Sequence, residues 1–152
     1  MTCPIFRQHG SRPTEIWHYG PAAQRTITAI IRWRHDIKPY LAQEMRKLNA
    51  TGRPLNRPLW WDFPADPATW AIDDEYMFGD EYLAAPVLEA GARSRTVYLP
   101  TAGKQEAATV WRHVWTNASY RGGANYSVDA PLDSFPLFRR VGQSSERFKI
   151  MT

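Results

Sequence analysis

The stretch that decides the fold class is residues 83–100, LAAPVLEAGARSRTVYLP. Two short apolar runs, Leu83–Val87 and Thr96–Leu99, lie on either side of Gly91. Short runs of this kind, bounded by Gly and Pro, are typical of β-strands separated by turns. We therefore expect two strands in this stretch.

The same pattern continues toward the C-terminus. Three further strands are expected, over Thr109–Trp115, Ala124–Val128 and Phe135–Val141. Turn signals separate them at Pro100–Gly103, Gly122–Gly123 and Pro131, and we interpret the glycine pair as a hairpin turn rather than a phosphate-binding loop. Several short strands with regular turns favour an antiparallel sandwich or barrel.

The pattern differs on the N-terminal side of residue 55. Apolar residues from Ala22 to Leu48 recur at steps of three, four and seven, which predicts a helix with one apolar face. These residues are Ala23, Ile27, Ile30, Ile31, Ile37, Leu41, Met45 and Leu48. Pro39 predicts a kink or two abutting helices, and Thr51-Gly52 predicts the helix end. Further on, Leu55–Phe63 is expected to be extended, and Ala68–Ile72 to contain a short helical piece.

The first residues predict one strand, Cys3–Phe6, followed by the polar loop Arg7–Pro21. A single strand and a single long helix cannot bury their own faces. We therefore expect residues 1–57 to be the last β/α unit of something larger, cut at Met1, that folds poorly alone. Residues 143–152 are expected to form a loose tail.

Composition excludes several classes of protein. The chain has 152 residues, a net charge of +4 and a pI of about 9.4, but its basic residues are scattered among acids. Scattered charge favours solvated faces over a nucleic-acid track. Aromatic residues make up 13%, with seven Trp, which fits either a Trp-rich core or a sugar-binding surface.

Cys3 is the single cysteine, so the sequence predicts no disulfide framework and no zinc site, and we interpret it as a small buried residue. No segment approaches the length of a membrane span, and residues 1–10 lack the apolar region of a signal peptide. The compartment therefore stays open. Three N-x-S/T triplets, beginning at Asn49, Asn117 and Asn125, are a weak hint of secretion.

His9 is the main candidate for chemistry. It follows the expected strand Cys3–Phe6, and ligand contacts in α/β barrels collect at the C-terminal ends of strands. A histidine there can hydrogen-bond a hydroxyl group, although backbone bonding within the loop is an alternative. Arg7 can contact substrate but fits a structural ion pair better. Glu15, Trp17 and Tyr19 lie in the same loop and fit packing better than a binding rim.

An acidic cluster comprises Asp62, Asp66, Asp73 and Asp74. Paired carboxylates can hydrolyse glycosides, but these lie beside prolines or expected helix ends, so we interpret them as turn and cap residues. Asp74 and Asp80 do not have the spacing of a calcium loop. The sequence lacks G-x-S-x-G, H-E-x-x-H, Walker and G-x-G-x-x-G motifs.

An ordered set of short motifs resembles glycoside hydrolase family 31. The phrase Phe6-Arg7-Gln8-His9-Gly10, then Glu15-Ile16-Trp17 and Tyr19-Gly20, resembles the last barrel loop of that family. Further motifs follow in the family's order: Pro39-Tyr40-Leu41, Gly52-Arg53-Pro54, Arg57-Pro58-Leu59, Phe63-Pro64 with Asp66, Tyr76-Met77-Phe78-Gly79, Ala85-Pro86-Val87-Leu88, Arg95 to Pro100, Tyr120-Arg121-Gly122-Gly123, Ala130-Pro131-Leu132-Asp133 and Phe135 to Arg139. The resemblance covers about Cys3 to Gly142, with Ala102–Ala108 as an apparent insertion.

The resemblance implies an α+β chain in two parts. Residues 1–57 correspond to strand 8, loop and helix 8 of a (β/α)8 TIM barrel, and 58–142 to the antiparallel β-sandwich that follows it. The family's members are retaining glycosidases with an Asp nucleophile and an Asp acid on earlier barrel strands. The family's W-x-D-M-N-E phrase does not occur here. The resemblance therefore implies no catalytic residue in this chain and a chain inactive alone.

His9 matches the family histidine that hydrogen-bonds the sugar in the −1 subsite, so the resemblance implies a substrate-binding role for it. The implied partners are an α-linked glucoside or xyloside and the remaining barrel portion, with no cofactor, metal, nucleic acid or membrane. The phrase Glu15-Ile16-Trp17 is slightly closer to xylosidase-like members. Two alternatives stay open: a non-catalytic carbohydrate-binding or accessory β-sandwich, and an interaction module or relic without a sugar role.

Overall fold

The computed structural model describes residues 2–3, 5, 10–102 and 109–142. The chain divides into two compact units, Met1–Arg53 and Pro54–Thr152. The division lies before the boundary at residue 57 that we expected, and the identities assigned to residues 1–57 and 58–142 stay predictions. The expected tail, residues 143–152, lies outside the described residues.

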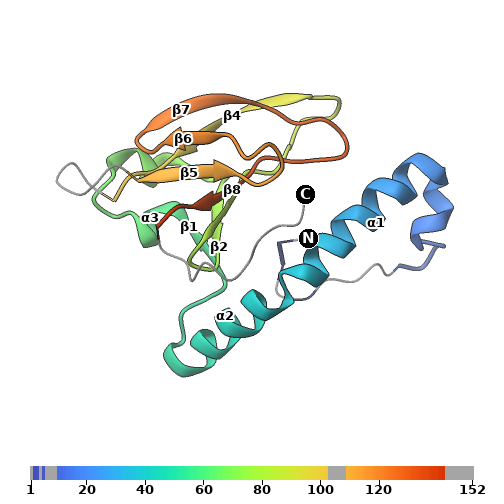
Figure 1. Cartoon of the computed structure of the whole chain (residues 1–152), viewed down its shortest axis with the longest axis horizontal. Coiled ribbons are helices and arrows are strands. Elements are labelled where there is room, and N and C mark those ends of the chain that lie inside the picture. The colour runs from blue at the N-terminus through green and yellow to red at the C-terminus, as the bar shows by residue number, and fades with distance from the viewer. Residues whose placement is uncertain (1, 4, 6–9, 103–108, 143–152) are drawn as a thin grey trace. The chain divides into compact units, whose positions relative to one another are not determined.

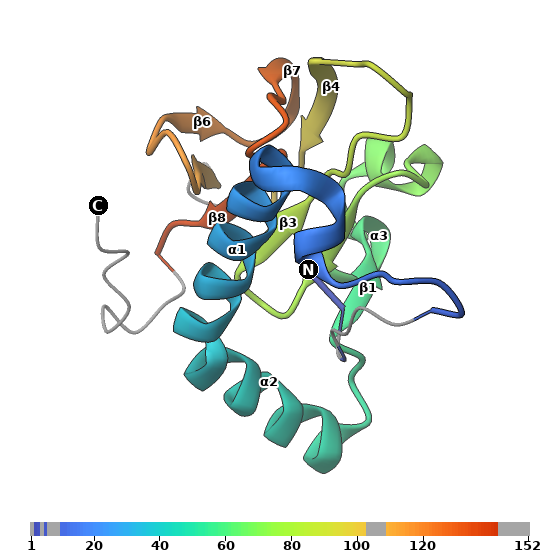
Figure 2. The ribbon, with the colours of Figure 1, turned by 90° about the vertical axis from the view of Figure 1, so that its right-hand side faces the viewer.

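The first unit contains the short 3-10 helix η1 (Ile16–Tyr19) and the α-helices α1 (Gly20–Asp36) and α2 (Lys38–Thr51). Figure 2 shows the chain changing direction between α1 and α2, as the sequence predicted. Pro39 lies in the first turn of α2, where its missing N–H is not needed for an intrahelical bond. Gly52 ends α2 in a left-handed conformation, with φ of 73°, and donates its N–H to the Leu48 carbonyl at 2.8 Å.

The buried face of the two helices differs from the predicted apolar stripe. The buried residues are Trp33, Ile37, Tyr40 and Glu44, of which only Ile37 belongs to that stripe, while Met45 is exposed. Steps of three and four still place the buried residues on one side of the helices. The other residues of the predicted stripe, apart from Met45, are half-buried, so the described structure covers that stripe only in part.

The expected N-terminal strand is wrong where it can be judged. Cys3 and Ile5 lie in bends, and among the described residues no strand precedes Asn56. The other two positions of that strand, Pro4 and Phe6, lie outside the described residues. A strand needs a neighbour to satisfy its backbone N–H and C=O groups, and the described part of this unit supplies none.

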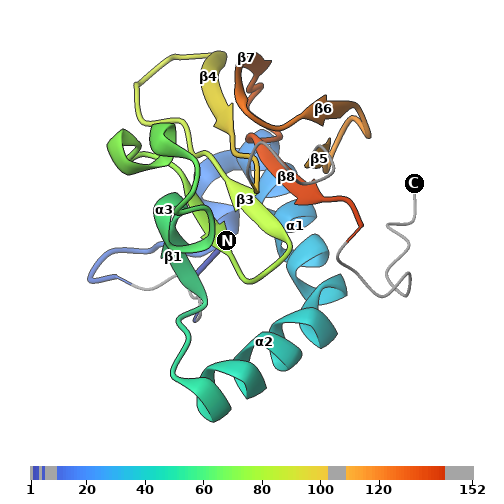
Figure 3. The ribbon, with the colours of Figure 1, turned by 90° about the vertical axis from the view of Figure 1, so that its left-hand side faces the viewer.

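The described residues of the second unit form eight short strands and two short helical pieces (Figure 1). They are β1 (Asn56–Pro58), α3 (Leu59–Asp62), η2 (Pro67–Ala71), β2 (Tyr76–Phe78), β3 (Tyr82–Ala84), β4 (Ser94–Leu99), β5 (Val110–His113), β6 (Ser119–Arg121), β7 (Ala124–Asp129) and β8 (Leu137–Arg140). Six strands form one sheet in the order β1-β2-β3-β8-β5-β6, and β4 pairs with β7 in a second (Figure 3). Every pairing is antiparallel, so the chain is α+β with antiparallel sheets.

The core of this unit lies where side chains of both sheets meet. Val97, Leu99 and Val128 come from the two-stranded sheet, and Met77, Leu83, Trp111 and Phe138 from the six-stranded one. Leu59 and Phe63, in and just after α3, complete the same cluster. Each is at most 4% exposed. Burial of this apolar area is the main force that holds the two sheets together.

All five strands expected in this unit are present, with β3, β5 and β8 shorter than expected and β4 and β7 longer. The sequence analysis missed β2 and β6, which have three residues each. A three-residue strand is too short for its alternation to be recognised. The expected extended segment Leu55–Phe63 is correct only for β1, because Leu59–Asp62 form α3. The expected helical piece near Ala68–Ile72 is confirmed by η2.

The hairpin expected at Gly122-Gly123 is wrong. These glycines connect β6 of the large sheet to β7 of the small one, so the chain passes from one sheet to the other there. Gly122 donates its N–H to the Thr109 carbonyl and Gly123 to the Leu99 carbonyl, at 2.7 and 2.6 Å. A Cβ at Gly122 would overlap the Pro100 carbonyl oxygen, and Gly123 has a φ of 88°, so both positions require glycine.

Candidate functional site

The main candidate, His9, and its neighbour Arg7 lie outside the described residues. Their expected roles therefore stay predictions. The loop that follows them is described from Gly10 onward, and it contains the other three candidates of the segment, Glu15, Trp17 and Tyr19.

A single turn of 3-10 helix, η1, orders this loop. Glu15 stands just before η1 and accepts the His18 N–H at its backbone oxygen at 2.9 Å. Its carboxylate oxygen Oε2 lies 3.3 Å from Nε2 of His18. Trp17 and Tyr19 are 62% and 54% exposed, so the packing that we expected for them is absent among the described residues. The loop thus presents two aromatic side chains beside one carboxylate.

Asp66 is a cap and a crosslink, in line with the expected turn-and-cap role of the acidic cluster. It is 5% exposed, and its Oδ1 accepts the Ala68 N–H at the start of η2. Its carboxylate also binds the Tyr98 hydroxyl and the Thr101 N–H. A carboxylate with these three donors is held for structure.

Arg57 is buried at 2% exposure and holds four partners. Nε donates to Asp62 Oδ2 at 2.8 Å, and Nη1 to the Pro54 carbonyl at 2.7 Å. Nη2 donates to the Gly79 carbonyl at 2.8 Å and to Asp80 Oδ1 at 3.0 Å. A buried guanidinium is stable only when its donors are satisfied in this way, so Asp62 and Asp80 serve the fold.

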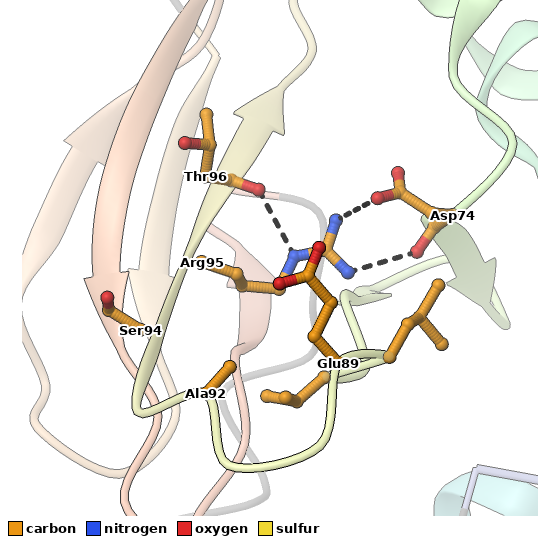
Figure 4. A pocket seen from close by; sticks show the side chains of 8 residues that line it. Asp74, Glu89, Ala92, Ser94, Arg95 and Thr96 are labelled. Atoms are coloured by element: carbon orange, nitrogen blue, oxygen red, sulfur yellow. Dashed lines mark hydrogen bonds and ion pairs between the residues drawn. The ribbon is translucent and has the colours of Figure 1, made fainter.

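Arg95, on β4, forms a second ion-pair group with Asp74 and Glu75. Its Nη2 lies 2.6 Å from Asp74 Oδ2 and 3.5 Å from Glu75 Oε1. Figure 4 shows the guanidinium directed at Asp74 and bonded to the Thr96 carbonyl. Asp74, Arg95 and Thr96 line a pocket of about 390 Å³, together with Val87, Leu88, Glu89, Ala92 and Ser94. The arginine is engaged with the protein, so the pocket does not offer it to an anion.

Glu75 is the most perturbed carboxyl among the described residues. It is 5% exposed, its Oε1 accepts the Tyr98 N–H at 2.8 Å, and its Oε2 has no hydrogen-bond partner in the described part of the chain. Burial raises the pKa of Glu75 from 4.5 to about 7, against the lowering effects of the Tyr98 N–H and Arg95. The sequence analysis missed this residue because nothing at the start of β2 marks Glu75 as buried.

His113, on β5, is a second buried titratable group. Its Nδ1 lies 3.0 Å from the Thr116 hydroxyl and accepts the Thr116 N–H at 3.3 Å, while its ring packs edge-on against Phe138. Nε2 has no partner among the described residues. Burial lowers the pKa of His113, so the neutral ring is favoured in the fold.

Three members of the acidic cluster thus have structural roles, Asp66 as a cap and Asp62 and Asp74 in ion pairs. No group of three or more His, Cys, Asp or Glu side chains able to hold a metal occurs in the described ranges. No described helix is long and apolar enough to cross a membrane. Cys3 is exposed, so the expectation that it is buried is wrong.

Comparison with protein families gives one match that covers more than half of the chain. The model described as the glycosyl hydrolase family 31 C-terminal domain matches residues 52–143. A probable glucan 1,3-alpha-glucosidase of Arabidopsis thaliana is 34% identical over 142 residues, which is 91% of this chain and 15% of that protein. An alpha-xylosidase of Saccharolobus solfataricus is 34% identical over 141 residues, or 92% of this chain and 18% of that protein.

Solved structures of the same family also match this chain. A GH31 alpha-xylosidase from Xanthomonas citri has a TM-score of 0.82 and 35% identity, over 91% of this chain and 15% of that one. A GH31 alpha-xylosidase from a soil metagenome, complexed with xylose, has a TM-score of 0.80 and 39% identity, over 86% of this chain and 18% of that one. The chain thus spans only 15% to 21% of the length of the curated relatives that it matches.

Proposed function

Because this chain belongs to glycoside hydrolase family 31, we propose that it is the C-terminal part of a retaining α-glycosidase acting on α-glucosides or α-xylosides. In this proposal residues 1–57 complete a (β/α)8 barrel and residues 58–142 form the sandwich packed after it. The observation that carries the proposal is similarity along almost the whole chain to named α-glucosidases and α-xylosidases. The chain matches 15% and 18% of the length of these two relatives, so the proposal assigns it one part of such an enzyme.

The proposed division of labour follows from the chemistry of retention. Retaining hydrolysis requires a carboxylate nucleophile and a carboxylic acid about 5–5.5 Å apart. The buried carboxylate of Asp66 accepts three donors, and Asp62 and Asp74 pair with Arg57 and Arg95. These engagements support a pair supplied from elsewhere in the complete enzyme, and an isolated chain without hydrolytic activity.

In the complete enzyme, His9 is proposed to hydrogen-bond a hydroxyl of the sugar in the −1 subsite. An imidazole can donate to or accept from a hydroxyl, and a bond that strengthens as the sugar distorts lowers the barrier.

The test is a chimera in which this chain replaces the matching segment of the alpha-xylosidase of Saccharolobus solfataricus, which is 34% identical to it. The expected result is hydrolysis of a p-nitrophenyl α-xyloside or α-glucoside with retention of the anomeric configuration, and no hydrolysis by the isolated chain. A chimera that melts cooperatively but has no activity contradicts the proposal, and so does activity of the isolated chain.

A further inference from the structure

Three tryptophans of the second unit gather in α3 and η2 instead of entering the core. The rings of Trp60 and Trp70 stack with centroids 5.4 Å apart and an interplanar angle of 13°. Trp61 lies tilted beside Trp60, with centroids 6.0 Å apart. Trp70 is 61% exposed and Trp61 48%, whereas Trp111 in the core is fully buried. Trp70 therefore stacks on one neighbour while most of its surface stays open to solvent.

The Trp70 ring is held in place before any ligand binds. Its Nε1 donates to the Pro64 carbonyl at 3.3 Å. The turn that carries it, η2, is fixed by the Asp66 cap and by buried Thr69, whose hydroxyl bonds the Phe63 and Asp66 carbonyls at 3.1 and 2.8 Å. A ring fixed in this way loses little conformational entropy when a flat ligand stacks on it.

The sequence segment that carries the stack disfavours one class of ligand that also binds aromatic platforms. Residues 59–92 contain no Lys or Arg, and their eight acidic residues are Asp62, Asp66, Asp73, Asp74, Glu75, Asp80, Glu81 and Glu89. Single-stranded nucleic acids need basic side chains for their phosphates as well as rings for their bases. The segment therefore suits an uncharged ligand with a flat apolar face.

We propose that Trp60 and Trp70 form a stacking platform for a pyranose ring of an α-linked glucan, separate from the −1 subsite assigned to His9. In an α-linked glucose only the anomeric oxygen is axial, so the opposite ring face, with its axial C–H groups at C2 and C4, is apolar and matches an indole ring. Galactose has an axial hydroxyl that interrupts this face. The choice of α-glucan rests on the proposed function, whereas stacking follows from the exposed Trp pair itself.

The test is a titration of the full 152-residue chain, labelled with 15N, with isomaltotriose and maltoheptaose, monitored at the tryptophan indole N–H signals. The expected result is saturable shifts at Trp60 and Trp70 with a Kd of about 1 mM, as suits one stacking contact. Trp70→Ala is expected to weaken binding by roughly tenfold, equivalent to about 1.4 kcal/mol. Trp70→Phe keeps a ring and is expected to lose less.

The matched control is Trp17→Ala, because Trp17 is 62% exposed but lies in the first unit. This variant is expected to bind the two glucans as tightly as the parent chain does. A galacto-oligosaccharide is expected to bind neither the parent chain nor the variant. Unchanged Trp111 and His113 signals confirm that a variant is folded. The proposal is overturned if no indole shift saturates, if Trp70→Ala binds as well as Trp17→Ala, or if the shifts follow protein concentration without sugar, which indicates self-association.

The outcome is independent of catalysis. Binding is read without hydrolysis, and His9→Ala is expected to leave the Trp60 and Trp70 shifts unchanged. If the titration shows no saturable shift but the chimera is active, only the proposed stacking platform is contradicted. If the titration saturates but the chimera is inactive, only the glycosidase proposal is contradicted.

Discussion

The carboxylate of Asp66 accepts the phenolic hydrogen of Tyr98, whose oxygen lies 2.8 Å from Oδ1 and 2.7 Å from Oδ2. The same carboxylate caps η2, so this contact ties η2 to β4. Burial and the neighbouring Asp66 raise the pKa of Tyr98, so the phenol stays protonated and remains a donor. Asp66 therefore acts as a structural crosslink in the second unit.

Tyr98→Phe is expected to lower the free energy of unfolding by about 1.5–3 kcal/mol, the usual range for a hydrogen bond to a charged group. Urea denaturation followed by circular dichroism measures this loss. The matched control is Tyr126→Phe, which removes a hydroxyl bonded to the Arg121 carbonyl at an exposed position, 2.9 Å away. Equal losses in the two variants would contradict the crosslink.

Arg57→Met is expected to destabilise the second unit by about 3–5 kcal/mol, because it removes a buried cation with four hydrogen-bond partners. Arg57→Lys is expected to recover only part of this loss, since an ammonium cannot reproduce the planar fork of a guanidinium. The control is Arg112→Ala, at an exposed position of β5. Thermal denaturation of the three variants ranks them, and a wild-type Tm for Arg57→Met would show that the ion-pair group carries no stability.

The buried carboxyl of Glu75 is expected to make stability fall as the pH rises. The pKa of Glu75 is about 7 in the folded chain, whereas its ordinary value is 4.5. Between pH 4.5 and 7 the folded state therefore holds a proton on Glu75 that the unfolded state releases. The contribution of Glu75 to the free energy of unfolding is then fully present below pH 4.5. It is lost as the pH rises through 7, and the loss amounts to about 3 kcal/mol. Glu75→Gln keeps an acceptor for the Tyr98 N–H and removes this dependence.

The measurement is the difference in unfolding free energy between wild type and Glu75→Gln across this pH range. Taking a difference cancels His113, whose lowered pKa acts in the opposite direction: its contribution is present above pH 6.5 and is lost on acidification. A difference that does not change with pH would show that Glu75 ionises freely.

Gly122→Ala is expected to destabilise the crossing between the two sheets by about 1–3 kcal/mol, because the added Cβ overlaps the Pro100 carbonyl. Gly91→Ala is the control, since a Cβ there has open space and only the positive φ of 81° is strained. Unfolding free energies that fall equally in both variants would mean that close packing at Gly122 is unimportant.

The sequence predicted the parts of the fold that depend on local signals. The break near Pro39, the helix end at Gly52 and five strands were recognised because Pro, Gly and apolar runs act on adjacent residues. The crossing at Gly122-Gly123 was misread because the partner of each strand depends on residues far along the chain. Glu75 was missed for the same reason, as its burial comes from Tyr98 and Arg95 on β4. His9 was proposed from resemblance to a family.

The most direct measurement for the central claim is kcat/KM for His9→Ala in the active chimera, beside His35→Ala at an exposed position of α1. A histidine that hydrogen-bonds the reacting sugar is expected to lower kcat/KM by about 10²-fold or more when removed, whereas His35→Ala leaves it unchanged. That result supports this chain as a substrate-binding part of a retaining α-glycosidase. Equal kcat/KM in both variants would contradict it.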